Sequence, residues 1–433
     1  MPQHTSGRLG GVFRALGSLL PEWSRRVAYG ARIVRPWRED SVRIHPTVGL
    51  TPSRLLSYLQ AADAGTPQMQ FEVFHEMLQK WPRLAAVEQT RRLALTGLDW
   101  EVLPATQPGM DGATARAAVA AADYCRETLR SLERFDEALD HLAHAIGAGV
   151  AVAELVWQNS RLVDLVPVPD SRLVSDPHEP WRLRILTEEE SDRGVAVDEQ
   201  TFKWVVHEPR AQAGRRFDGG LLRASALLYV AQNLSFKDWL IFSEIAGMPV
   251  RVAQFDPGTP EPDKQELLKM LQALGTDAVA AFGKNVDLKL LDVSHSGERP
   301  YQPLQDHCNT EVTILWLGQH LTTDLRTSGS RAAAEIHDRV REDLLVNDIA
   351  AEGRTVRREV LTPMVRAHLG DAVPVPRFRR SLAQAVDTKV LAGVLAVAIN
   401  QLGLAVPKRW IHQSLGIPEP SANEPVVVAR RAP

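Results

Sequence analysis

One stretch of this sequence, residues 220–246, carries apolar side chains on nearly every side and constrains the fold more than any other feature. It follows Gly219 and ends at Gly247-Met248-Pro249, and as a helix it would be about 40 Å long. Polar residues between Gln232 and Asp238 interrupt it, which excludes a lipid-spanning helix. A helix that is apolar all round must be covered on several sides, either by its own domain or by other copies of the chain.

The composition limits the class of protein. The chain of 433 residues is long enough for two or three packed units, and its hydrophobic share of 44% is ordinary for a globular protein. A formal net charge of −3 argues against tight, sequence-specific DNA binding, but it leaves open a protein that lets DNA slide past. Cys125 and Cys308, the only cysteines, fit a reducing compartment and provide no disulfide framework. We expect no membrane segment.

Apolar spacing up to about residue 210 predicts an α+β domain with a modest, mostly antiparallel sheet. Residues at helical spacing flank Trp81-Pro82, where proline ends one helix and allows the next to begin. Two alternating segments joined by Gln158-Asn159-Ser160 are typical of paired strands. The expected helices are 52–62, one on each side of residues 81–82, 114–132 and 134–146, and the expected strands are 98–103, 150–157, 161–168, 182–186 and 202–207.

Beyond the apolar stretch, the pattern predicts a small insert followed by long helices. The insert is expected to contain strand 250–255, helix 263–274 and strands 278–282 and 286–293. A second apolar helix at 304–317 leads into a polar loop, 318–330, rich in Thr and Ser. The remaining expected helices are 331–369, 382–402 and 408–415. Pro363 is expected to kink the first of these or end it early.

No short catalytic motif is complete in this sequence. His75-Glu76 begins like a zinc-protease motif, but Gln79 stands where the second histidine belongs. Gly283-Lys284 is similar to a phosphate-binding loop, but the first glycine and the hydroxyl residue of that motif are missing.

Two histidines offer a weaker signal. His141 and His144 lie one helical turn apart beside Glu137 and Asp140, and together they could form a metal-binding face. Exposed or core-edge histidines are more common than ligands at such positions. We therefore predict no catalytic residue, no metal and no cofactor.

The order of the expected elements resembles that of a known family. A helix, a small α/β insert, a second helix, a polar loop and a long helix, attached to an α+β body, resemble the portal proteins of tailed phages. Several segments are similar to the Mu-like portal family: PRLAAV at 82–87, QTRR at 89–92, TGLDWEV at 96–102, GAGVAVAELVW at 147–157, KDW at 237–239, GMP at 247–249 and WIHQSLGIPEP at 410–420. Each segment is weakly specific, whereas their order over roughly residues 30–420 is more specific.

The resemblance implies a helix-rich α+β portal architecture with wing, stem, clip, tunnel loop and crown. The implied regions are an Arg-rich N-terminal arm and wing at 1–215, a first stem helix at 216–247, a clip at 248–300, a second stem helix at 301–317, a tunnel loop at 318–330, a long wing helix at 331–375, a helical crown at 376–420 and a disordered tail at 421–433. The physics of rings agrees, because a closed ring gives each subunit two different interfaces, and a helix apolar on all sides can pack between two neighbours.

The resemblance also implies candidate site residues. Hydroxyl and arginine side chains in the loop could contact phosphate without reading sequence. The expected channel residues are Thr322, Thr323, Asp324, Arg326, Thr327, Ser328, Ser330 and Arg331. The expected subunit-interface residues are Leu228, Leu234, Trp239, Phe242 and Trp316, and the expected docking residues of the clip are Lys264, Lys269, Lys284 and Lys289. An ordinary interhelical loop capped by Ser330 and a solvated lysine surface would explain the same residues.

Function and partners follow from the same resemblance. It implies a ring of twelve copies at one capsid vertex, through which double-stranded DNA is packaged and ejected without sequence specificity. The ring would dock the terminase large subunit, head-completion or adaptor proteins and the major capsid protein. It would be a virion component assembled in the cytoplasm of the bacterial host. Two alternatives stay open: a metal-dependent hydrolase or nuclease built on scattered residues such as Asp140, His141 and His144, and a head structural protein other than the portal.

Overall fold

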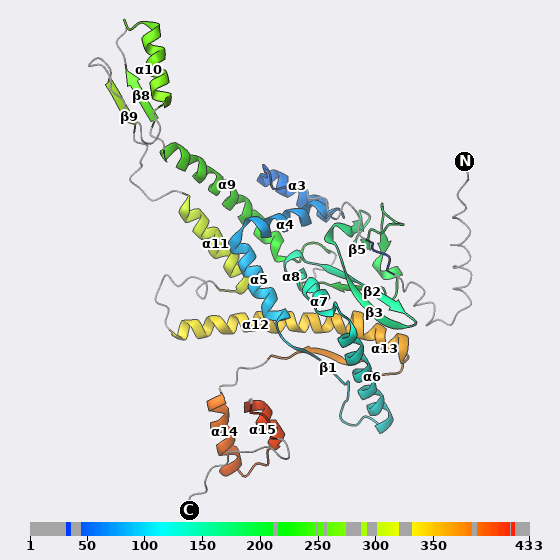
Figure 1. Ribbon diagram of the computed structural model, residues 1–433. Coiled ribbons are helices and arrows are strands. Elements are labelled where there is room, and N and C mark those ends of the chain that lie inside the picture. The colour runs from blue at the N-terminus through cyan, green and yellow to red at the C-terminus, as the bar shows by residue number, and fades with distance from the viewer. Residues whose placement is uncertain are drawn as a thin grey trace, which may run out of the picture. The chain divides into compact units, whose positions relative to one another are not determined.

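The computed structural model describes residues 32–35, 45–210, 215–247, 250–254, 258–273, 287–291, 301–319, 331–382, 388–415 and 417–420. The chain divides into two compact units, Met1–Arg379 and Arg380–Pro433. Helices predominate and the strands form small sheets (Figure 1), so the expected helix-rich α+β class is confirmed. Within the described ranges, every helix is too short or too polar to span a lipid bilayer.

Near its N-terminal end the first unit contains three consecutive helices: α3 (Pro52–Asp63), α4 (Gln68–Lys80) and α5 (Pro82–Thr96). Thr51 caps α3, because its side chain accepts a hydrogen bond from the backbone N–H of Arg54. Trp81 separates α4 from α5 in an extended conformation, and its buried indole donates to Asn309 Oδ1 at 2.9 Å. The break predicted at Trp81-Pro82 is confirmed, since proline lacks the N–H that a continuous helix would need.

The central sheet contains the predicted hairpin and one further strand. Its strands are β2 (Ala151–Gln158), β3 (Arg161–Val168) and β7 (Trp204–His207). β2 lies in the middle, antiparallel to both neighbours. Asn159 and Ser160 have φ values of 49° and 63°, the left-handed conformation that a tight hairpin turn requires, so the turn predicted at residues 158–160 is confirmed.

The remaining strands of the first unit pair separately rather than extending this sheet. They are β1 (Trp100–Leu103), β4 (Leu173–Asp176), β5 (Glu179–Ile185), β6 (Val195–Ala196) and β10 (Arg377–Arg380). β5 lies between β4 and β6, whereas β1 pairs with β10. The expectation of one modest sheet is therefore wrong, because a strand's apolar pattern does not specify its partner. A short 3₁₀ turn, η1 (Asp170–Arg172), joins β3 to β4.

Helices cover the central sheet. They are α6 (Gly112–Ser131), α7 (Phe135–Ala143) and α8 (Ala145–Ala148). The single helix expected at 134–146 is wrong: it is divided at His144, and α8 ends at Gly149, whose φ is 96°. All four residues of α8 are buried, and the helix packs against the start of the long apolar helix.

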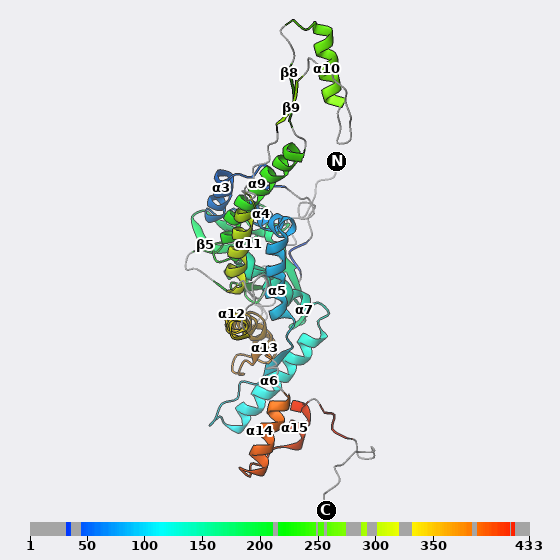
Figure 2. The ribbon, with the colours of Figure 1, turned by 90° about the vertical axis from the view of Figure 1, so that its left-hand side faces the viewer.

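The predicted long apolar helix is α9 (Leu221–Gly247), and the predicted second apolar helix is α11 (Gln302–Leu317). In sequence they flank an insert of β8 (Val250–Gln254), α10 (Glu261–Ala273) and β9 (Asp287–Leu291), in which the strands pair antiparallel. The strand expected at 278–282 lies outside the described residues. Figures 1 and 2 show α9 and α11 side by side, and α5 packs along α11.

The long helix expected at 331–369 is confirmed with an irregularity. It consists of α12 (Arg331–Val356), a π-helical turn η3 (Arg357–Leu361) and α13 (Thr362–His368). Pro363 lies in the first turn of α13, directly after the wide turn. Since proline cannot donate a backbone hydrogen bond to the preceding turn, it disturbs the helix where the sequence predicted a kink.

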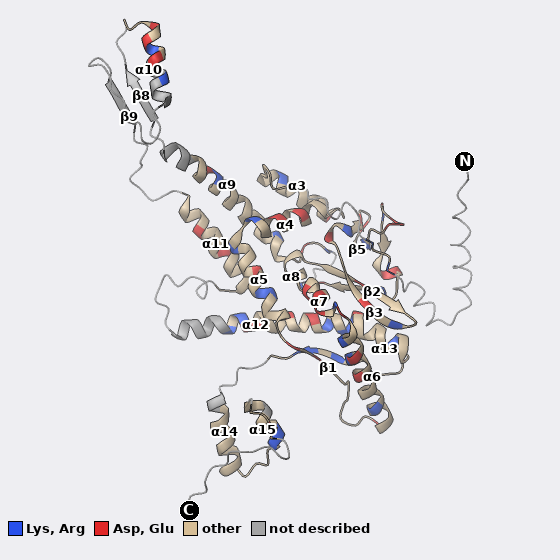
Figure 3. Cartoon of the chain, viewed as in Figure 1, with Lys and Arg blue, Asp and Glu red and all other residues tan. Residues whose placement is uncertain are grey.

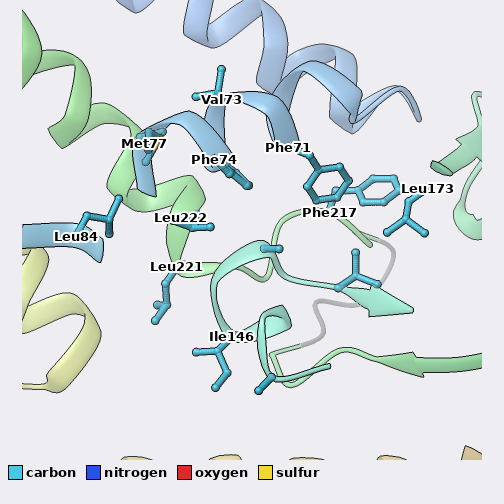
Figure 4. Packing of buried hydrophobic residues seen from close by; sticks show 14 of the residues in the cluster. Phe71, Val73, Phe74, Met77, Leu84, Ile146, Leu173, Phe217, Leu221 and Leu222 are labelled. Atoms are coloured by element: carbon cyan, nitrogen blue, oxygen red, sulfur yellow. The ribbon is translucent and has the colours of Figure 1, made fainter. Parts of the chain in front are cut away.

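Two apolar clusters hold the first unit together. One joins α3, α4 and α5 to the start of α9 and to α11; Figure 4 shows Phe74 and Met77 of α4 near Leu222, and Phe71 beside Phe217. The other lies between the central sheet, α6, α7 and the η3–α13 segment. The second unit contains α14 (Thr388–Asn400) and α15 (Lys408–Leu415), which contact each other. Of the helix expected at 382–402, residues 388–400 form α14 and residues 383–387 lie outside the described set; the helix expected at 408–415 is confirmed.

Candidate functional site

The first turns of α9 are fixed to the body of the chain by close backbone packing. A Cβ atom on Gly220 would lie 2.1 Å from the carbonyl oxygen of Gly147, so only glycine allows this approach. A Cβ atom on Gly147 would in turn lie 2.9 Å from the Trp316 ring. Leu221 and Leu222 follow directly and are buried (Figure 4). The start of α9 is thus a core element of its own domain.

The second half of α9, from Leu234 onward, is here called its outer half. It differs from the first turns, because its large apolar side chains face solvent in the single chain. Four large apolar side chains of this half are 41–53% exposed: Leu234, Phe236, Leu240 and Ile241. Leu227, nearer the start of the helix, is 63% exposed. Scattered exposed leucines are common in soluble proteins, whereas successive turns of exposed apolar residues are typical of an interaction surface. Figure 3 shows few charges along this part of α9.

The predicted subunit-interface residues separate accordingly. Leu234 is exposed, and Trp239 is partly buried, with its ring edge-on to Phe236 at 6.5 Å between centroids. Leu228 packs partly against the main core, and the side chain of Phe242 lies outside the described residues. Trp316 was wrongly placed at the interface, because it is 1% exposed and its indole donates to Ser225 Oγ at 3.1 Å inside the chain's own core.

Most of the predicted channel loop lies outside the described residues. Gly318 ends α11 with a φ of 71°, and Gln319 follows it. The expected channel residues that fall in the undescribed segment are Thr322, Thr323, Asp324, Arg326, Thr327, Ser328 and Ser330. Arg331 begins α12, but its side chain is also outside the described set.

The predicted docking lysines lie in the insert. Lys264 on α10 is 3.5 Å from Glu261, one turn earlier, and Lys269 on the same helix is exposed. Lys289 pairs with Val252 between β9 and β8, and its side chain is not described. Lys284 lies outside the described residues. The contacts of Lys264 are those of an ordinary solvated helix surface.

A buried arginine that the sequence analysis did not single out joins the apolar helices to the long helix. Arg91 of α5 donates from Nε and Nη2 to the two oxygens of Asp348 on α12, at 2.9 and 3.0 Å. Its Nη1 donates to the carbonyl oxygen of Trp316 at 2.9 Å, near the end of α11. Arg91 falls on the buried face of α5 with Leu84, Val87 and Leu95. An arginine on an apolar stripe was the available signal, because a buried guanidinium requires a partner.

The residues weighed for a hydrolase line one cavity, but each has a separate partner. Asp140 forms an ion pair with Arg92 of α5. His141 donates from Nε2 to the carbonyl oxygen of Val152 at 3.0 Å, and burial lowers the pKa of this imidazole. His144 instead lies beside Asp170 of η1. Asp140, His141 and His144, for which the sequence analysis favoured no metal, therefore have three different partners.

Comparisons with known proteins give the family. The family model described as the portal protein of Mu bacteriophage matches residues 71–417. The portal protein of Escherichia phage Mu is 26% identical over 390 residues, which cover 88% of this chain and 74% of that relative. The Mu-like prophage FluMu protein gp29 of Haemophilus influenzae is 25% identical over 395 residues, with the same two shares.

Solved structures share the fold at low identity. A chain from the virion of a native gene transfer agent particle has a TM-score of 0.53 at 12% identity, covering 88% of this chain and 97% of that one. A chain from the neck of the native particle, computed with C12 symmetry, also has a TM-score of 0.53, at 13% identity over 85% and 94% of the two chains. With the paired apolar helices, the insert between them and a family match over most of its length, this chain belongs to the family of Mu bacteriophage portal proteins.

Proposed function

We propose that this chain is a portal subunit that assembles with copies of itself into a ring of twelve around a channel for double-stranded DNA. The observation that carries the proposal is the exposed apolar outer half of α9. A cyclic ring uses heterologous interfaces, so each subunit must offer one surface to each of two neighbours. Burying the α9 side chains against a neighbour would remove apolar area from water, which favours association.

The slightly negative net charge of the chain is better suited to letting DNA pass than to holding it. The chain has a formal net charge of −3, and tight contacts to many phosphates would hold the duplex in place. In this proposal the loop 318–330 faces the channel, where Arg326 and the hydroxyl residues make brief contacts without reading the sequence. In this proposal the two segments of the expected wing, 1–215 and 331–375, flank the stem helices in sequence, and 376–420 forms the crown.

The insert at 248–300 would dock partners outside the capsid. Its helix α10 carries Lys264 and Lys269 among acidic residues, a mixture suited to the polar rim of a protein interface. The partners in this proposal are the terminase large subunit and head-completion or adaptor proteins, with the major capsid protein around the ring. The ring would assemble in the host cytoplasm and remain at one vertex of the virion. The role is structural, and packaging energy would come from the separate terminase.

Assembly can be tested at one exposed position of α9. We expect the wild-type chain to form rings with an axial hole, measured by light scattering and electron microscopy. Leu240→Asp places a charge on the surface to be buried, so it should reduce assembly to monomers of unchanged helicity. Leu240→Met is the matched control and should assemble normally, because it stays apolar with similar volume. Normal rings from Leu240→Asp, or a wild-type chain that stays monomeric, would contradict the proposal.

A further inference from the structure

A cavity of about 650 Å³ lies beside α4, α5, α7 and η1, on the body of the chain rather than on α9 or the insert. Among the described residues, its lining includes six carboxylates, four histidines and one arginine. Several of these groups already have partners: Glu76 binds Lys80 at 2.7 Å and Arg92 binds Glu88 at 2.9 Å. The electrostatic balance of the lining favours a cation.

Three of the lining residues converge on a point. Asp170 Oδ2 lies 3.3 Å from His75 Nε2 and 3.4 Å from His144 Nε2, and the three donor atoms all lie within 4.8 Å of one another. Two ligands of a tetrahedral zinc ion, with bonds of roughly 2.0–2.1 Å, lie about 3.4 Å apart. The two separations from Asp170 therefore match a shared ion better than they match hydrogen bonds, which are usually shorter.

Buried polar atoms at the same point have no hydrogen-bond partner. The Asp170 side chain is 4% exposed, yet its Oδ1 accepts no hydrogen bond. His144 Nε2 is also buried and makes no hydrogen bond. A buried carboxylate oxygen and a buried imidazole nitrogen without hydrogen bonds are costly, so they need an explanation, and an ion coordinated by both residues is one.

We propose that His75, His144 and Asp170 bind one Zn²⁺ ion. Two imidazole nitrogens and one carboxylate are a donor set suited to zinc, whereas Mg²⁺ and Ca²⁺ prefer oxygen ligands alone. The fourth position opens to the cavity and can hold a water molecule. His75 comes from α4, His144 from the α7–α8 junction and Asp170 from η1, so the ion joins three segments that are distant in sequence. Binding to the folded chain alone stabilises it.

Zinc content and affinity test this site without reference to ring assembly. The purified full chain is stripped with a chelator, reloaded with Zn²⁺ and measured by elemental analysis and calorimetry. We expect one zinc ion per chain and a higher melting temperature after loading. His75→Ala removes a half-exposed ligand, so the chain should still fold. Its dissociation constant for zinc should rise by about tenfold or more.

The matched control is another histidine of the same cavity. His45 contacts Glu76 Oε1 at 2.7 Å and is not one of the three ligands, so His45→Ala should bind zinc as the wild type does. Equal zinc binding by His75→Ala and the wild type would overturn the proposal, as would a wild-type chain that takes up no zinc.

Cobalt provides a second readout of geometry. Co²⁺ in place of Zn²⁺ absorbs strongly in the visible range when it is four-coordinate. We expect this absorption in the wild type and in His45→Ala, and its loss in His75→Ala and Asp170→Asn. If Asp170→Asn fails to fold, the comparison of His75→Ala with His45→Ala still decides. The same absorption in His75→Ala as in the wild type would reject His75 as a ligand.

Discussion

Glu154 lies fully buried in the middle of the apolar strand β2. Its carboxylate accepts hydrogen bonds from Lys203 Nζ at 2.7 Å and from the backbone N–H groups of Ile33 and Val34 at 2.6 and 3.0 Å. These donors satisfy the buried charge and attach the segment 32–35 to the central sheet. The sequence shows that Glu154 is the one charged residue in an apolar strand. The groups that donate hydrogen bonds to it lie about 50 and 120 residues away along the chain, so the sequence did not identify them.

A second buried group, His207 of β7, makes stability depend on pH. Its Nδ1 lies 2.9 Å from Thr355 Oγ1 on α12, and it is 1% exposed. Burial, aided by the positive charges of Arg354 and Arg358, lowers the pKa of this imidazole from 6.5 to about 4. The folded chain therefore holds His207 neutral at pH values where the unfolded chain already binds a proton.

The expected result is a loss of stability below pH 6.5. Because the folded pKa is the lower one, this contribution is present above pH 6.5 and is lost as the pH falls towards 4. Between pH 7 and pH 5 the loss from this group is about 2 kcal/mol. His207→Gln cannot titrate, so its unfolding free energy, measured with urea at pH 7, 6 and 5, should fall less steeply. Equal slopes for variant and wild type would show that His207 does not control this range.

At the scale of elements, the Arg91–Asp348 pair joins three helices at one place. It connects α5 to α12 and, through the carbonyl oxygen of Trp316, to the end of α11. Both side chains are at most 5% exposed. A buried pair of this kind contributes modestly as a whole, but removing one partner leaves an uncompensated charge in the core.

Arg91→Met should therefore destabilise the chain by about 3–5 kcal/mol. The double variant Arg91→Met with Asp348→Leu removes both charges and should recover most of that loss, because an apolar pair of similar size can replace a buried ion pair. Chemical denaturation of the three chains checks this. If the double variant is as unstable as Arg91→Met alone, the unpaired charge of Asp348 is not the cause.

For the whole molecule, the long apolar helix divides into two halves with different surroundings. The first turns of α9 are buried in the chain's own core, whereas the outer turns expose Leu234, Phe236 and Leu240. Coverage by the chain's own domain thus holds for the first half of the helix, whereas coverage of the exposed half by other copies is our proposal. In the proposed ring, the buried half anchors each subunit and the exposed half packs against a neighbour.

The proposed channel loop gives a prediction at this scale. Arg326→Ala should leave ring assembly intact but reduce packaging or retention of DNA, since it removes a phosphate contact and no apolar contact. The DNA content of purified heads, with ring formation measured in parallel, checks this. Arg326→Lys keeps the charge and should retain most DNA. Loss of rings in Arg326→Ala would instead assign the loop a structural role.

The local elements could be predicted from residues close together in the sequence. Helical and alternating periods, the proline after Trp81 and the turn at Asn159-Ser160 each act within a few residues, so the helices and the central hairpin could be predicted. The order of these elements also carried the resemblance to the family that the comparisons show.

Which surfaces meet could be seen only in the folded chain. It paired β1 with β10, placed Trp316 in the core and divided the helix at His144. It also brought His75 and Asp170 to His144, although Gln79 had made the motif at His75 look incomplete. The physical reason is that a periodic pattern shows which face of an element is apolar or polar, whereas the group that satisfies that face comes from a distant part of the chain.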